Sequence, residues 1–232
     1  MDIKEYKKRF FKAIKPVADE LRRAGFEIKK DDFSHIKAKN GTIIDMKTAG
    51  ITVEDDDLEL LMQKYNPLPK EAVDILLKWI PKVKYEPAQE VLVSQLSKPK
   101  EKYDGNILLD LFKQTNSHLL RERIGFVLSE SKPSLDLQEL ENILWDQEYG
   151  ETKSTMLITG IKLLVAEKIN PILINEFDKY PWFCWDCVKG LQKTGGKKEL
   201  EFLEKRLVDT KLSKKEKNAI EKAIKSIKND RS

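Results

Sequence analysis

The chain has 232 residues, 40% of them hydrophobic and 35% charged, and its 43 basic and 39 acidic residues leave a net charge of only +4. This balance excludes a polyelectrolyte and fits a thin fold with a narrow core and a large surface of mixed charge. Two cysteines cannot form a disulfide framework, and the sequence has no signal peptide and no apolar run of about 18 residues, so we expect a cytoplasmic protein without a membrane partner.

The first 25 residues are predicted to form an amphipathic helix. Apolar side chains recur at steps of three and four residues, as on one face of an α-helix. They are Tyr6, Phe10, Phe11, Ile14, Val17, Ala18 and Leu21. Gly25 suits the position that follows a helix end, whereas Pro16 is expected to kink or divide the helix. The other face is basic, which is typical of a capping helix with one solvated side.

Residues 26–54 break this pattern. Apolar and polar residues alternate on both sides of Asn40 and Gly41, a pair that accepts the positive φ values of a type I′ turn. We therefore predict a small β-hairpin or an irregular loop here. A short helix is predicted over residues 58–65, with the aspartates at 55–57 placed where negative charge complements the helix dipole.

The remainder of the chain is built from a repeat, best seen in residues 107–128. This stretch reads as two short amphipathic helices with a turn near residues 115–117. Similar first-helix blocks occupy residues 75–80, 107–112, 140–145, 172–177 and 202–207. Similar second-helix blocks occupy residues 91–96, 123–128, 156–161, 186–191 and 219–224. Both series recur every 30 to 33 residues, a period that indicates a stack of helical hairpins.

This repeat divides the chain into residues 1–66, with the capping helix and the irregular or hairpin segment, and residues 67–232, a continuous repeat domain. Four prolines are predicted in first turns of helices, where a missing N–H costs nothing: Pro69, Pro87, Pro171 and Pro181. Asp104 and Ser134 are predicted N-caps, and Ser213 with Glu216 is predicted to form a capping box.

The helical pairs resemble HEAT repeats, in particular the short HEAT-like kind found in bacteria, whose second helix carries a pattern such as A-I-x-A-L. Here the corresponding stretches are VLVSQL, MLITGI and AIEKAI. The resemblance implies an all-α fold, a right-handed α–α superhelix of the armadillo type, in which about five hairpins place their second helices on the concave face. In such proteins that face usually binds protein. In some branches it binds nucleic acid or takes part in chromophore attachment, and a few members are DNA glycosylases that act on alkylated bases.

Cys184 and Cys187 form a CxxC motif, which can be a redox pair or half of a zinc site. The repeat favours a simpler interpretation, because Cys187 falls in a row of core positions. That row holds Leu92, Ile124, Leu157 and Ile220. Cys184 falls in a mostly polar row and is expected to be more exposed. We predict no metal, no cofactor and no catalytic residue.

Two aromatic residues stand out from their rows in the second helices. Phe126 aligns with Ser94, Thr159, Lys189 and Lys222. Trp185 aligns with Glu90, Glu122, Thr155 and Asn218. An exposed aromatic residue in a polar row is a candidate binding hot spot, although Trp185 could instead pack against the adjacent loop.

We therefore predict a non-catalytic scaffold that binds a macromolecule, most readily a protein, on the concave face. The predicted binding residues are Arg121, Arg123, Phe126, Trp185, Asp186 and Lys189. The same helices carry Lys153 and Lys222, which could add to a weakly positive groove interrupted by acidic residues. The alternative is a nucleic-acid-binding protein, and even a base-excision glycosylase, that uses Trp182, Trp185 and Asp186 around an extrahelical base.

Overall fold

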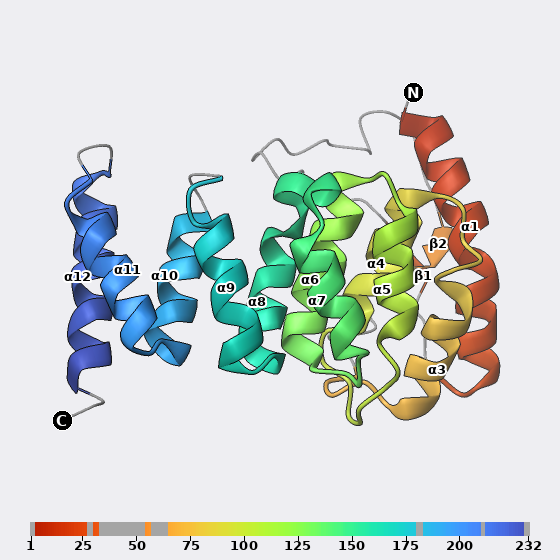
Figure 1. Ribbon diagram of the computed structural model, residues 1–232. Helices are drawn as coiled ribbons and strands as arrows, with labels where there is room; N and C mark the ends of the chain where they lie inside the picture. The colour runs from red at the N-terminus through yellow and green to blue at the C-terminus, as the bar shows by residue number, and fades with distance from the viewer. Residues whose placement is uncertain are drawn as a thin grey trace. The chain divides into compact units, whose positions relative to one another are not determined.

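In a computed structural model, the structure describes residues 3–26, 30–32, 54–56, 65–179, 183–209 and 212–229, and most of them are helical (Figure 1). The predicted all-α class is confirmed at this level. None of the described helices is long and apolar enough to cross a membrane. The chain divides into two compact units, Met1–Tyr103 and Asp104–Ser232. The boundary predicted at residue 66 therefore lies inside the first unit.

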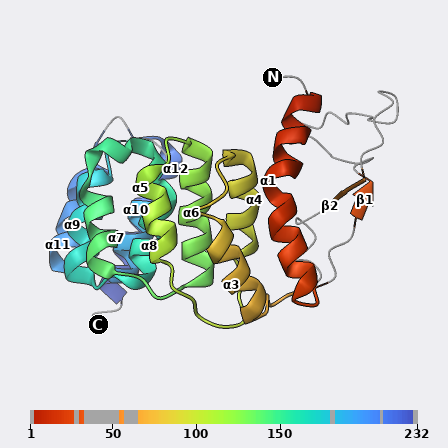
Figure 2. The same cartoon turned by 90° about the vertical axis from the view of Figure 1, so that its right-hand side faces the viewer.

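The first unit contains α1 (Ile3–Arg23), which lies beside α3 (Lys70–Trp79) and α4 (Glu86–Gln95) (Figure 2). The predicted apolar stripe is buried at Ile14 and Leu21. Helix α1 continues through Pro16 and ends at Arg23, and Gly25 occupies the expected position just past its end with a φ of +89°. There the Phe26 N–H donates to the Leu21 carbonyl and the Gly25 N–H to that of Arg22, which together form a Schellman motif.

A short antiparallel ladder joins β1 (Lys30–Asp32) to β2 (Glu54–Asp56). Two of the three aspartates that were predicted to precede a helix therefore lie in a strand instead. The predicted helix over residues 58–65 falls almost entirely outside the described residues. The predicted hairpin turn at Asn40 and Gly41 lies outside them as well.

The second unit is a run of helices joined by short connections. The helices are α5 (Asn106–Gln114), α6 (His118–Ser131), α7 (Leu137–Trp145), α8 (Ser154–Leu163), α9 (Ala166–Glu176), α10 (Phe183–Thr194), α11 (Lys197–Leu207) and α12 (Lys214–Asn229). A 3₁₀ turn, η1 (Gln147–Lys153), precedes α8. The predicted second-helix blocks fall on α4, α6, α8, α10 and α12, and the first-helix blocks fall on α3, α5, α7, α9 and α11, with at most one residue beyond a helix end.

Within this unit the helices form two layers. One layer is α5, α7, α9 and α11, each packed on the next, and the other is α6, α8, α10 and α12 (Figure 1). Each helix also packs on the partner that precedes or follows it in the chain, so the core lies between the layers. Helices α6 and α8 approach very closely at Gly125, where a Cβ atom would lie 2.2 Å from the Thr155 hydroxyl oxygen.

The helix ends follow the predictions in part. Ser213 and Glu216 form the predicted capping box, since each side chain accepts from the other residue's backbone N–H, at 2.7 Å and 3.3 Å. Ser134 was wrongly predicted as an N-cap, because Asp136 accepts from the backbone N–H groups of Gln138 and Glu139 instead. Asp104 precedes the actual cap residue, Gly105, although its carboxylate does accept from the Asn106 N–H.

Of the four prolines predicted in first turns, one lies there among the described residues. Pro87 lies in the first turn of α4, and Pro69 is the residue just before α3. Pro171, however, lies in the middle of α9, because that helix begins at Ala166 rather than next to the proline. Pro181 lies outside the described residues.

One hydrogen bond recurs in three helical pairs and was not predicted. A long side chain in the first turn of the second helix, or just before it, donates to a backbone carbonyl nine residues earlier, at the end of the first helix. The three bonds are Gln89 Nε2 to Ile80 O at 3.0 Å, Arg121 Nε to Phe112 O at 3.1 Å and Lys153 Nζ to Leu144 O at 2.8 Å. Carbonyls at a helix end have no partner within the helix, so each bond satisfies an acceptor that would otherwise be buried without one.

Candidate functional site

The predicted binding residues all lie on α6 and α10, in the layer of the second unit that also contains α8 and α12. We call the solvent-exposed side of these four helices the inner-helix face. Phe126 on α6 is 48% exposed and Trp185 on α10 is 40% exposed, so both aromatic side chains contribute to this face. Their exposure agrees with the mostly polar rows in which the sequence places them.

The burial pattern gives a common register in which residues of the four helices of the inner-helix face can be compared. Each helix buries the residues that pack against the other layer, such as Ile124, Cys187 and Ile220. The exposed residue two positions beyond each of them is Phe126, Lys189 or Lys222. In α8 the corresponding residue is Ile158. We call these four residues the central row: Phe126, Ile158, Lys189 and Lys222.

The predicted alignment in α8 is wrong by one residue. Thr159 was aligned with Phe126, yet Thr159 is fully buried, and its hydroxyl donates to the Gly125 carbonyl at 3.1 Å. Arg121 and Lys153 donate to equivalent carbonyls of their first helices. Equivalent residues of α6 and α8 are therefore 32 positions apart in the sequence, not 33. Ile158, which is partly exposed, therefore belongs in the central row.

The two predicted arginines differ in their surroundings. The guanidinium group of Arg121 is held inside the unit, because it donates to the Phe112 carbonyl and lies 5.5 Å and 4.9 Å from the ring centroids of Phe112 and Tyr149. Arg123 is partly exposed and makes no ion pair with any residue that the structure describes. Arg121 thus contributes to packing, and Arg123 remains available on the face.

Asp186 and Lys189 lie one turn apart on α10. Asp186 is half-buried, and this burial raises the pKa of its carboxyl group, while the nearby charge of Lys189 opposes the rise. Lys189 is exposed. The pair therefore presents an accessible ammonium group beside a carboxylate that is partly shielded from solvent.

The CxxC motif is buried. Cys187 is fully buried, as predicted, but Cys184 is only 4% exposed, so the expectation of an exposed thiol is wrong. Both thiols are free, and burial raises the pKa of Cys184 to about 11 and raises that of Cys187 further. A redox-active cysteine requires a lowered thiol pKa, so the environment opposes the redox interpretation. No group of three or more candidate metal ligands occurs among the described residues.

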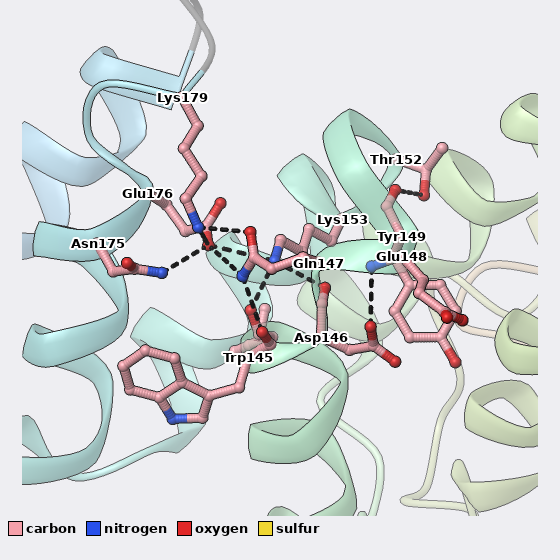
Figure 3. A network of polar contacts seen from close by, with 11 residues as sticks. Trp145, Asp146, Gln147, Glu148, Tyr149, Thr152, Lys153, Asn175, Glu176 and Lys179 are labelled. Carbon is pink, nitrogen blue, oxygen red and sulfur yellow. Dashed lines mark hydrogen bonds and ion pairs between the residues drawn. The ribbon is translucent and has the colours of Figure 1, made fainter.

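A buried charged network lies where η1 meets the end of α9 (Figure 3). Lys153 and Glu176 are both fully buried, with Lys153 Nζ 3.2 Å from Glu176 Oε1. The same ammonium group donates to the backbone carbonyls of Leu144 and Asp146, at 2.8 Å and 2.9 Å. All three N–H bonds of Lys153 therefore have an acceptor.

The carboxylate of Glu176 is surrounded by donors on one oxygen only. Its Oε1 also accepts from Lys179 Nζ at 2.9 Å, from Asn175 Nδ2 at 3.2 Å and from Gln147 Nε2 at 3.3 Å (Figure 3). The Oε2 atom is buried and has no hydrogen-bond partner among the described residues. Burial lowers the pKa of Lys153, whereas the negative charge of Glu176 opposes this shift.

This network was missed from the sequence. Lys153 was considered as part of an exposed basic groove, and it is instead enclosed between the layers. No periodic pattern could have shown this, because its partner Glu176 belongs to another helix. Trp182, which the nucleic-acid alternative requires together with Trp185 and Asp186, lies outside the described residues.

Comparisons of the chain with protein-family models, with curated proteins and with solved structures found no match.

Proposed function

We propose that this protein is a non-catalytic scaffold of the HEAT-like, armadillo type that binds a protein partner on the inner-helix face. In this proposal the helical pairs of about five repeats form a right-handed α-solenoid, and the inner-helix face is its concave side. The two-layer packing of α5 to α12 supports the solenoid, since each helical pair buries its apolar surface against its neighbours.

The observation that carries the proposal is the exposure of Phe126 and Trp185 on one side of one layer. Burying a large apolar side chain yields about 1.5–3 kcal/mol, so two such side chains exposed on the same face leave a favourable contribution for a partner to use. Aromatic residues and arginine are also the residues that most often dominate binding energy at protein interfaces. Arg123 lies one turn from Phe126 on α6, where it can support the same contact.

The experiment is site-specific photo-crosslinking. A photoreactive phenylalanine analogue replaces Phe126 or Trp185 in the full chain, and crosslinked partners from the native cells are identified by mass spectrometry. The control carries the same analogue at Val208, which is 78% exposed at the end of α11. We expect one protein to be captured at both test positions but not at Val208. Equal capture at all three positions would refute a specific protein-binding face.

A second candidate, nucleic-acid binding, is favoured by the composition of α12, which carries six lysines and two glutamates. Phosphate contacts made by lysine weaken steeply as salt increases. We would therefore measure binding of duplex DNA and single-stranded RNA at low and physiological salt. Binding that is strong at low salt and is lost on Lys222→Glu would favour this candidate over the protein scaffold.

A further inference from the structure

The central row is apolar on two helices and basic on the other two. Its α6 and α8 members, Phe126 and Ile158, are apolar, whereas its α10 and α12 members, Lys189 and Lys222, are exposed lysines. The four helices pack in the order α6, α8, α10, α12, so the apolar half and the basic half adjoin each other. A ligand that lies across the helices would meet both halves in turn.

The apolar and basic halves of the row also differ in how many of their basic residues form ion pairs. On α6 and α8, Lys162 Nζ lies 3.2 Å from the Glu130 carboxylate, and Arg123 is the basic residue beside Phe126 that makes no ion pair with a described residue. On α10 and α12 the exposed side carries Lys189, Lys193, Lys222 and Lys225 against Asp186 and Glu221. Lys193, Lys222 and Lys225 make no ion pair with any other residue that the structure describes. The second half therefore has an excess of positive charge that is not neutralised within the described chain.

Trp185 lies one helical turn before Lys189 on α10, on the same exposed side. Its ring is a flat apolar surface at the edge of the basic half. An aliphatic or aromatic side chain could pack on it while a neighbouring acidic group reaches Lys189. The basic half therefore has an apolar contact of its own, which an extended polypeptide can use and which a purely electrostatic ligand does not require.

We propose that the inner-helix face binds an extended segment of a partner protein, whose apolar residues contact Phe126 and Ile158 and whose acidic residues contact Lys189 and Lys222. This inference rests on the proposed function and specifies its ligand. Neighbouring packed helices are about 8–10 Å apart, so the row spans roughly 24–30 Å, the length of about seven to nine residues in an extended chain. A short linear motif with an apolar end and an acidic end fits this row.

The first experiment is selection of random peptides on the full-length chain by display. We expect enriched peptides to carry an apolar cluster followed or preceded by aspartate or glutamate within about nine residues. A labelled peptide of the consensus sequence is then titrated by fluorescence anisotropy. Lys189→Glu combined with Lys222→Glu is expected to weaken binding about tenfold or more. The matched control, Lys197→Glu with Lys198→Glu on α11, places the same two charge reversals on exposed residues of the other layer.

A charge exchange makes the test specific. A consensus peptide whose acidic residues are replaced by lysine should bind the Lys189→Glu, Lys222→Glu variant better than it binds the wild type. Loss of binding without such a recovery would overturn the proposed acidic contact. Phe126→Ala is expected to weaken binding of the peptide by a similar factor, whether the peptide carries acidic residues or lysines.

Other outcomes separate the inference from the proposed function. Peptides that depend on Phe126 and Trp185 but show no acidic preference would overturn the inference and leave the protein scaffold intact. An absence of both peptide binding and crosslinking would overturn both. Displacement of the consensus peptide by oligo-dT at physiological salt, with loss of oligo-dT binding on Lys222→Glu, would overturn the inference in favour of nucleic acid.

Discussion

Replacing Lys153 with methionine tests the role of the buried network. Methionine keeps an unbranched apolar side chain but removes the ammonium group that donates to the carbonyls of Leu144 and Asp146. Removing one member of a buried ion pair costs about 3–5 kcal/mol. We expect about 3 kcal/mol, at the lower end of that range, because Lys179 still lies 2.9 Å from the same oxygen of Glu176.

The free energy of unfolding is measured by urea titration, with helical circular dichroism as the signal. Lys162→Met is the matched control, since Lys162 is a partly exposed lysine paired with Glu130, and it should cost about 1 kcal/mol or less. Adding Glu176→Gln to Lys153→Met should recover part of the loss, because it removes the buried carboxylate that has lost the buried ammonium group of Lys153. A Lys153→Met protein as stable as the Lys162→Met protein would refute the reasoning.

The pH dependence gives an independent check on the same residue. Burial lowers the pKa of Lys153 in the folded protein, so between that lowered pKa and the ordinary value of 10.5 the unfolded chain binds more protons than the folded one. Stability rises with pH wherever the unfolded state binds more protons. The stability difference between wild type and Lys153→Met should therefore increase with pH in this alkaline window, and a decrease there would contradict the assigned shift.

Three further predictions concern other parts of the chain. Arg121→Met should lower the free energy of unfolding by about 2 kcal/mol in urea titration, because it removes a charged hydrogen bond to the Phe112 carbonyl and two ring contacts. Loss of affinity for a partner without loss of stability would show a role in binding instead. Gly125→Ala should cost at least about 2 kcal/mol, since the added methyl group would meet the facing helix, and an unchanged melting temperature would exclude that close approach. Cys184 and Cys187 should react with a thiol reagent at neutral pH only after unfolding in urea, because burial raises the pKa of Cys184 to about 11, and rapid labelling of the folded chain would disprove this.

The repeat period predicted the helices because it reflects burial directly. A residue such as Ile124 or Leu128 recurs where the helix meets the other layer, and both are fully buried. The same period could not show the position of helix ends, which depend on local hydrogen bonds. For this reason Ser134 was predicted as a cap where Asp136 is the cap, and Pro171 was placed at the start of a helix that begins five residues earlier.

The error at Cys184 has a clear physical cause. Its row also contains Gln89 and Arg121, and polar residues in a row suggested exposure. In the structure, however, Gln89 is only 6% exposed, and its polar tip reaches a backbone carbonyl rather than solvent. The row is polar because a helix end needs a donor, not because it faces water. A thiol in the same row can therefore be buried.

The candidate surface could be predicted only in part, because sequence rows do not show an error of register or a contact with another helix. Phe126 and Trp185 were identified because they differ in kind from their rows, and their exposure agrees with that prediction. Ile158 was overlooked because an error of one residue in α8 placed Thr159 in its row. Lys153 was assigned to the surface because a lysine is rarely buried, and its partner lies in a different helix.

The recurring bond between the start of a second helix and the end of a first helix bears on the order in which the chain opens. Among the described residues it occurs in the pairs α3–α4, α5–α6 and α7–α8, but not in α9–α10, where Cys184 occupies the row, nor in α11–α12. A pair without this bond loses fewer contacts when its helices separate. Amide protons in α11 and α12 should therefore exchange with deuterium sooner than those in α6 and α8, so that local unfolding proceeds from the C-terminal pair inward.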